Sequence, residues 1–386
     1  MSQLRIATFN LLHGQPLAPD GTPLPFPPRP ADPTAAAALL AEAVAALDAD
    51  VLALQEVDRC QPRSGLVDQA AVAARAMGAS DWRFAAALHG RPAPVSGWVR
   101  DASAVDFRVY GPAGADGALD APSYGTALLT RLPVRHWRAR RFPPAPFGLP
   151  LRVAGRRGLT QVPDEPRAAL AAVLEGDRGP FTAVAAHLSF VPGWNVAQLA
   201  AIRRWIADLP RPYLLLGDFN LVGAVPRTVL GGAAVVEGVT RAPRRGRRRT
   251  ARVDVPALGA VAALGPEPAL PAGPGPADGP AGESAGTTRV RSSRRRLRDL
   301  REARRTRLER TGRDRPRIRR SPRRLGRQGL QGWRDLARTP TYPSHRPAVQ
   351  FDHVLAVGLR PAAVGAALTP RTPISDHRPL LVHVDL

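Results

Sequence analysis

Five stretches of this chain share one pattern, an apolar run typical of a strand that meets a polar residue at one end. The best defined is Tyr213–Asn220, in which Tyr-Leu-Leu-Leu precedes Gly-Asp-Phe-Asn. Consecutive apolar residues indicate a buried strand. The other runs meet polar residues as well: Asn10, Glu56, His187, and Asp376 with His377. Together the five runs predict strands that bring such side chains to one rim.

The polar residues of the central run, Asp218 and Asn220, are two positions apart. In an extended chain both side chains therefore point to the same side. A carboxylate and a carboxamide in one cleft suit a hard cation, or a phosphate oxygen together with an attacking water. The alternative is a strand that runs into an Asx turn, because Asp and Asn are common turn formers.

The residue types suggest separate roles. Glu56 directly follows Val-Leu-Ala-Leu-Gln and is the best candidate for a metal ligand, with a structural salt bridge as the alternative. Asn10 could share the metal, hold a phosphate oxygen, or be a satisfied buried amide. His377 is the natural acid/base or phosphate-binding group, and an imidazole needs an acceptor on its second nitrogen to fix its tautomer. Because the adjacent Asp376 points elsewhere, we expect the distant Asp352 to be that acceptor.

Two other histidines and several absent motifs narrow the chemistry. His353 points away from its neighbour Asp352, which favours a structural role. His187 could donate a proton, bind a phosphate oxygen, or simply pack in the core. The sequence has no Gly-x-Ser-x-Gly, no Walker loop, no cysteine cluster and no Gly-x-Gly-x-x-Gly after a strand. Nucleophilic serine chemistry and dinucleotide binding therefore fit less well than hydrolysis at phosphorus.

Length and composition set the broad class. A chain of 386 residues suits one large domain or two ordinary ones. Cys60 is the only cysteine, so no disulfide can form within the chain and a reducing compartment is expected. The chain starts with polar residues and has no apolar run of about 18 residues, so we predict neither a signal peptide nor a membrane span. The default expectation is a cytoplasmic monomer.

The net charge of +23 is unevenly distributed. Residues 241–330 hold 26 arginines against 8 acidic residues, and the rest of the chain is close to balance. This segment is rich in Ala, Pro and Gly and has few large apolar residues, so we predict a disordered insertion. It could bind nucleic acid as a basic tether, or be a tolerated insertion without a partner. Residues 1–240 and 331–386 would then form the catalytic domain.

The remaining pattern alternates strands with helices. Helices are expected over Ala35–Leu47 with Thr34 as N-cap, over Asp68–Met77 and over Gln198–Leu209. A hairpin is expected between Arg167–Leu174 and Phe181–His187, and Arg135–Arg141 is expected to pair with Tyr124–Arg131. These elements indicate a mixed sheet sandwich flanked by helices.

The ordered motifs resemble a known family. They are Thr8-Phe-Asn10, Gln55-Glu56-Val-Asp58, His187-Leu, Gly217-Asp-Phe-Asn220, Phe351-Asp-His353 and Ser375-Asp-His377. The set resembles the endonuclease/exonuclease/phosphatase superfamily, with its deoxyribonuclease I-like fold, over residues 4–240 and 333–386. The resemblance implies an α/β (α+β) four-layer sandwich of two mainly antiparallel sheets flanked by helices. It also implies hydrolysis of a phosphate ester with Mg²⁺ or Mn²⁺ bound by Glu56, with Asn10 and Asp376 close by.

The resemblance also implies catalytic roles. Asp218 orients or deprotonates the attacking water, and Asn220 holds a phosphate oxygen. His377, oriented by Asp352, contacts the phosphate, while His187 stands where the family has a His or Tyr near the leaving group. The roles of Asp218 and His377 as base remain exchangeable.

Three functions are compatible with these residues. The first is a metal-dependent phosphodiesterase. The second is a DNA endonuclease or exonuclease that uses the arginine-rich insertion as a binding arm, and the third is a non-catalytic nucleic-acid-binding protein. The substrate stays open among DNA, a nucleotide, a lipid headgroup and an inositol phosphate.

Overall fold

The computed structural model describes residues 3–24, 33–93, 96–102, 107–112, 121–151, 157–240, 253–255, 332–359 and 364–386. The side chains of residues 33, 233–240 and 253–255 are outside this description. The described residues belong to one compact unit, Met1–Gly259 with Leu325–Leu386. Most of the predicted insertion, 241–330, lies outside the described residues. Its exception is residues 253–255, which form a strand, so the prediction of disorder does not hold for this Val-Asp-Val triplet.

The first sheet has the strand order β16-β17-β1-β2-β6-β3-β4, with β5 beside β3. Its strands are β1 Leu4–Asn10, β2 Val51–Arg59, β3 Asp81–Pro92, β4 Trp98–Arg100, β5 Arg108–Tyr110, β6 Ser123–Thr130, β16 Val364–Leu368 and β17 Leu380–Val384. Strands β1 and β2 run parallel, and the other pairs are antiparallel. The N-terminal strand is thus paired on both sides.

The second sheet has the order β13-β7-β10-β11-β12-β15-β14. Its strands are β7 Val134–Phe142, β10 Arg167–Gly176, β11 Gly179–His187, β12 Tyr213–Asp218, β13 Val253–Val255, β14 Arg334–Asp335 and β15 Asp352–Val357. The predicted hairpin is confirmed as β10 and β11. Strands β11 and β12 run parallel, and the other pairs are antiparallel.

The predicted pairing of Arg135–Arg141 with Tyr124–Arg131 is wrong. Strand β7 pairs with β10 in the second sheet, while β6 pairs with β2 and β3 in the first. The turn before Val134 contains Pro133, which has no N–H to continue a ladder. The chain changes sheets there, and Trp137 of β7 is buried between the two sheets.

The helices are α1 Pro33–Ala45, α2 Gln69–Met77, α3 Trp194–Trp205 and α4 Val225–Thr240, with short 3-10 turns η1 Leu12–Gly14 and η2 Pro62–Ser64 and a small hairpin of β8 Leu149–Leu151 and β9 Thr160–Val162. Helix α2 has its predicted ends: the Asp68 carboxylate accepts from the Ala71 N–H, and Gly78 ends the helix with φ of 67°. Thr34 is not the N-cap of α1, because the helix already begins at Pro33, a residue favoured in a first turn. Helix α3 begins before the predicted Gln198, and sequence patterns predicted neither α4 nor β16.

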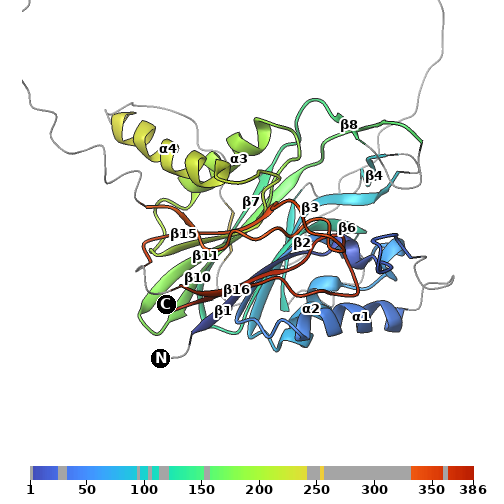
Figure 1. The fold of residues 1–386 in the computed structure, drawn as a ribbon, viewed down its shortest axis with the longest axis horizontal. Helices are drawn as coiled ribbons and strands as arrows, with labels where there is room; N and C mark the ends of the chain where they lie inside the picture. The colour runs from blue at the N-terminus through green and yellow to red at the C-terminus, as the bar shows by residue number, and fades with distance from the viewer. Residues whose placement is uncertain are drawn as a thin grey trace, which may run out of the picture. The chain divides into compact units, whose positions relative to one another are not determined.

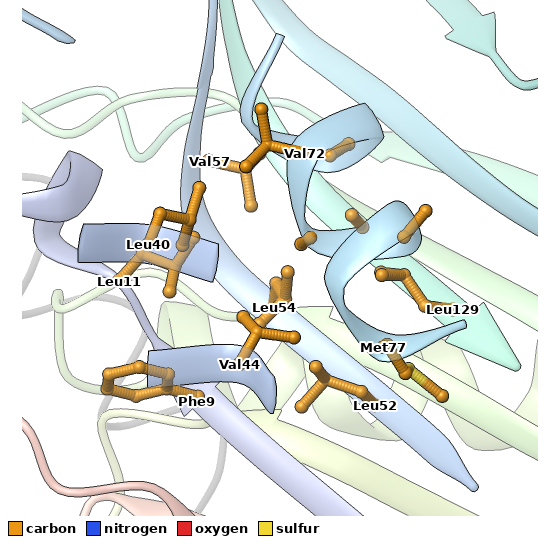
Figure 2. Packing of buried hydrophobic residues seen from close by; sticks show 14 of the residues in the cluster. Phe9, Leu11, Leu40, Val44, Leu52, Leu54, Val57, Val72, Met77 and Leu129 are labelled. Carbon is orange, nitrogen blue, oxygen red and sulfur yellow. The ribbon is translucent and has the colours of Figure 1, made fainter. Parts of the chain in front are cut away.

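The two sheets pack face to face with helices on both outer faces, which confirms the four-layer sandwich (Figure 1). Successive residues of β12 face opposite sides, so Leu214 and Leu216 enter the core between the sheets and Leu215 packs under α3 and α4. The first sheet packs its other face on α1 and α2. Figure 2 shows that cluster, in which Leu52 and Leu54 of β2 lie beside Val44 and Met77 of the helices.

Candidate active site

The register of three neighbouring strands places three predicted site residues side by side. In the pairing of β11, β12 and β15, His187 is opposite Asp218 and Asp218 is opposite Asp352. The end of β1 in the other sheet lies close to the same position. There the amide nitrogen of Asn10 donates to Asp218 Oδ2 at 3.0 Å and to Glu56 Oε1 at 3.1 Å. One buried amide therefore links the carboxylates of the two sheets.

Glu56 reaches this position through a bulge. Strand β2 does not end at Glu56, as the sequence pattern predicted, but continues to Arg59. Its pairing with β6 shifts between Leu54 and Val57, and Glu56 has φ of 54°. An extra residue in the left-handed region bends the strand and redirects a side chain, at a cost of order 1 kcal/mol or more. The bulge turns Glu56 toward Asn10 rather than into either core.

The surroundings of Glu56 are rich in negative charge. Burial raises the pKa of its carboxyl to about 7, and the charges of Asp376 and Glu165 add to this effect. The hydrogen bond from Asn10 and the charge of Arg167 oppose it without cancelling it. Crowded carboxylates with oxygen donors are the groups that hard divalent cations prefer. Glu56 and Asp376 therefore fit a divalent cation.

Asn10 contributes less directly to such a cation. Its amide oxygen accepts from the Leu12 N–H at 3.0 Å, and its nitrogen faces the two carboxylates. In this structure Asn10 therefore positions Glu56 and Asp218. Asp376, next to His377, is partly exposed, and burial raises the pKa of its carboxyl.

His377 lies between two aspartates. Its Nδ1 is 2.8 Å from Asp352 Oδ2, which confirms the predicted contact, and its Nε2 is 3.9 Å from Asp218 Oδ2. The Asp352 carboxylate also accepts from the Thr341 hydroxyl. Burial lowers the pKa of His377, but the charges of Asp352, Asp218 and Asp376 outweigh it and raise that pKa to about 10. The ring is therefore an imidazolium at neutral pH.

Among the described residues, Asp218, Asp352 and His377 also meet the spacing of a metal site, with ligand atoms within 4.8 Å of one another. Their hydrogen bonding argues for a different role. Nδ1 of His377 is already bonded to Asp352, and a protonated ring has no lone pair to offer a cation. We therefore interpret these three residues as a charged, hydrogen-bonded group in which Asp352 and Asp218 hold the His377 ring, and not as metal ligands.

The segment after Asp218 follows the Asx-turn alternative that the sequence left open. The Asn220 N–H donates to Asp218 Oδ1 at 2.9 Å, which is an Asx turn beside the site. Asn220 has φ of 49°, so the extended-chain reason for expecting both side chains on one side is wrong. Its amide nitrogen donates to the Leu188 carbonyl at 3.0 Å. The turn fixes the Asp218 carboxylate, whose pKa burial raises although the charge of His377 lowers it.

His187 is held by a buried charge network. Arg167 Nη1 is 2.9 Å from Nδ1 of His187 and 2.8 Å from Glu165 Oε1. Burial lowers the pKa of His187 and the charge of Arg167 lowers it further, so the ring is neutral. Arg167 Nη1 is also 3.3 Å from Nε2, but because an arginine can only donate and Nδ1 is the nearer nitrogen, we assign Nδ1 as the acceptor and place the proton on Nε2. Nε2 is 3.9 Å from Asp218 Oδ2.

The other predicted histidine, His353, lies behind the site. Its Nδ1 is 3.2 Å from Asp335 Oδ2, its Nε2 is 2.8 Å from the Leu221 carbonyl, and its ring stacks on Phe219. It supports the segment that carries Asp218.

Sequence reasoning assigned no role to several aromatic groups at the site. Tyr342 and Phe351 are partly exposed and lie beside the His377 ring, at centroid distances of 5.0 and 6.4 Å. Trp98 donates its ring N–H to Glu165 Oε2 at 2.6 Å. These residues come from loops and short strands with no periodic pattern, and single aromatic residues carry no signal of their own.

A model of the Endonuclease/Exonuclease/phosphatase family matches residues 7–377. The chain belongs to this family. Members of the family are phosphoester hydrolases and generally depend on a divalent metal. The match includes all eight predicted site residues, from Asn10 to His377.

Several solved structures are similar to this chain at low identity. They include an endonuclease/exonuclease/phosphatase from Beutenbergia cavernae (17% identity, covering 100% of this chain and 72% of that one, TM-score 0.42) and one from Bacteroides vulgatus (13%, 100% of each chain, 0.44). Sphingomyelinase C from Streptomyces griseocarneus is another (14%, 100% of each chain, 0.40). A search of curated proteins finds no match. The family assignment therefore depends on the family model.

Proposed function

We propose that this protein is a phosphodiesterase that depends on Mg²⁺ or Mn²⁺ and cleaves its substrate by in-line attack of water on phosphorus. The observation that carries the proposal is the line Asp352–His377–Asp218, which meets the carboxylate of Glu56 through Asn10. It combines an imidazolium, a buried carboxylate and a cluster of cation ligands around one point. Together these groups can activate a water and offset the charge that develops in the hydrolysis of an anionic ester.

Glu56 and Asp376 are the residues that would hold the cation. When bound, a divalent cation offsets the charge that develops on the phosphate oxygens. Burial, with the charges of Asp376 and Glu165, raises the pKa of Glu56 to about 7, and a bound cation would offset this cost of ionising the carboxyl. Asn10 keeps Glu56 and Asp218 at a fixed separation by donating to both.

The protonation states support an assignment of the base. His377 is positively charged at neutral pH and cannot accept a proton, so we assign the general base to Asp218. The water oxygen forms the new bond to phosphorus as the bond to the leaving oxygen breaks, and Asp218 takes the proton of the water. The His377 imidazolium stabilises the phosphate, the leaving oxygen takes a proton from solvent, and the neutral His187 donates a hydrogen bond from Nε2 to that oxygen. Asn220 fixes Asp218 through its N–H.

The charge balance favours a diester over a monoester. The carboxylates of Glu56, Asp218, Asp352 and Asp376 surround the site, while Arg167 is already paired with Glu165. A diester brings one negative charge into this environment and a monoester brings nearly two at neutral pH. The described site contains too few unpaired cations for the second charge.

The test is hydrolysis of bis(p-nitrophenyl) phosphate and p-nitrophenyl phosphate, each with Mg²⁺, with Mn²⁺ and with EDTA. We expect cleavage of the diester with either metal, little cleavage of the monoester, and loss of activity in EDTA. Asp218→Asn should lower kcat by about 10²-fold or more. Asp208→Asn is the matched control, because Asp208 pairs with Arg138 on the surface. Diester turnover that survives EDTA or Asp218→Asn would contradict the mechanism.

A further inference from the structure

Asp58 belongs to a sequence motif that the proposed mechanism does not use. It is fully buried on β2, two residues after Glu56. Its oxygens accept from Arg63 Nε and Nη2, both at 2.8 Å. Two parallel bonds of this kind hold a guanidinium in one orientation. The buried carboxylate of Asp58 thus fixes the orientation of Arg63 in the turn η2.

The held guanidinium lies on two aromatic rings. The carbon of the Arg63 guanidinium is 5.1 Å from the centroid of Trp98 and 5.6 Å from that of Tyr124, and the two rings are 4.9 Å apart. Contacts of this geometry are cation–π interactions, which restrict the cation further. Even so, 28% of the Arg63 side chain is exposed. Among the described residues, none accepts a hydrogen bond from its remaining nitrogen, Nη1.

This arginine lies next to the candidate active site. Trp98 donates to Glu165, which pairs with Arg167, and Arg167 contacts His187. The charges of Glu56 and Glu165 both act on the Tyr124 hydroxyl, as does that of Arg63. The positive group is therefore connected to His187 through Trp98, Glu165 and Arg167, and the charge of Glu56 also acts on it.

We propose that Arg63 is a specificity-determining residue that binds a second phosphate of the substrate, next to the phosphate that is cleaved. The proposal rests on the phosphodiesterase function above. In the proposed mechanism Asp218, His377 and Glu56 position the scissile phosphate, so Arg63 is left to bind a second one. The guanidinium of Arg63 is held in place by Asp58, and its Nη1 can donate a hydrogen bond to a phosphate oxygen. A purely structural Asp58–Arg63 pair would need neither the exposed edge nor the aromatic rings.

Two ligands that differ by one phosphate test the proposal: thymidine 5'-phosphate and thymidine 3',5'-bisphosphate, titrated calorimetrically into the protein at fixed Mg²⁺. We expect the wild type to bind the bisphosphate about 10- to 100-fold more tightly, the range for a charged hydrogen bond. Arg63→Gln should bring the ratio of the two Kd values close to one. Arg138→Gln is the matched control, because it breaks another two-bonded pair, with Asp208, and removes the same charge.

Folding and binding are separated by a second variant. Arg63→Gln leaves Asp58 buried without a cation, which is destabilising. The double variant Asp58→Asn/Arg63→Gln restores a neutral hydrogen-bonded pair and should show the same loss of preference. A wild-type ratio near one, or a preference that persists in both variants, would overturn the proposal.

Turnover distinguishes this proposal from the proposed function. The p-nitrophenyl ester of thymidine 5'-phosphate is assayed with and without a 3'-phosphate, and kcat/KM should favour the 3'-phosphorylated ester in the wild type alone. If neither ester is cleaved, the phosphodiesterase function fails, while the binding ratio still decides the role of Arg63.

The dinucleotide pTpT identifies the source of the second phosphate. Tighter binding of pTpT than of the bisphosphate supports a nucleic-acid strand, and the reverse supports a small molecule.

Discussion

Replacing Glu56 by Gln should stabilise the metal-free protein at alkaline pH while removing its activity. A glutamine keeps the size of the side chain and can still accept from the Asn10 amide, which donates to Oε1 at 3.1 Å. It cannot ionise. The substitution therefore isolates the free-energy cost of placing a negative charge among Asp376 and Glu165.

The magnitude follows from the pKa. The folded protein raises the pKa of Glu56 from 4.5 to about 7, so it binds the proton more tightly than the unfolded chain does. The free energy of unfolding therefore falls as the pH rises from 4.5 to 7, and stays low above 7. At 1.36 kcal/mol for each pKa unit the full cost is roughly 3 kcal/mol. Because the side chain is partly exposed, water screens part of it, and we expect about 2 kcal/mol.

The assay is thermal unfolding in EDTA across pH 5 to 8.5. At pH 8 the variant should melt about 4 °C above the wild type, and the difference should shrink to about a quarter of this as the pH falls to 5. Adding Mn²⁺ should reverse the order, because only the wild type gains stability from binding the ion. Glu42→Gln, at an exposed position of α1, controls for the loss of one charge. A variant that is less stable than the wild type at pH 8, or a difference independent of pH, would refute the reasoning.

Three further predictions use the same site. The Kd for Mn²⁺, measured by calorimetry, should rise about tenfold for each pH unit below 7, because Glu56 must lose its proton to bind; a flat profile would exclude Glu56 as a ligand. His377→Ala should lower kcat on bis(p-nitrophenyl) phosphate by about 10²-fold or more with an unchanged circular dichroism spectrum, and an unaffected rate would remove the imidazolium from the mechanism. Deleting Ala260–Arg324, which lies outside the compact unit of the site residues, should change diester turnover by less than about twofold; loss of turnover would show that this segment is needed for catalysis.

The strand ends were the part of the site that the sequence could predict. Asn10, His187 and Asp218 each close a strand, as their apolar runs indicated. An apolar run stops where the chain supplies a polar side chain to the site, so its last residue is readable from the pattern. The pairing of His377 with Asp352 was predictable for a chemical reason, because a neighbour in sequence cannot reach the second ring nitrogen.

The orientation of individual side chains could not be predicted in the same way. The alternation of a regular strand would place the Glu56 side chain on one face of the sheet or the other. The bulge at this residue interrupts the alternation, so the sequence pattern does not predict where the side chain points. The amide of Asn10 turns its nitrogen to two carboxylates because they come from opposite sheets, and no local pattern contains that information. Arg63, Trp98 and Tyr124 come from three separate segments, so their contact could not be predicted from the sequence either.

Several departures from local backbone preference lie at the candidate site. Glu56, Asn220 and Ser375 all have positive φ, an uncommon conformation for residues other than glycine, and each lies within or beside the candidate site. Ser375 uses its hydroxyl to donate to the Asn10 carbonyl at 2.6 Å and to accept from the His377 N–H at 3.1 Å. It therefore ties the loop that carries His377 to the strand that carries Asn10. Such strain persists only where surrounding contacts enforce it. The two sheets supply those contacts, which is why a rigid sandwich can hold a carboxylate cluster that would otherwise push its own members apart.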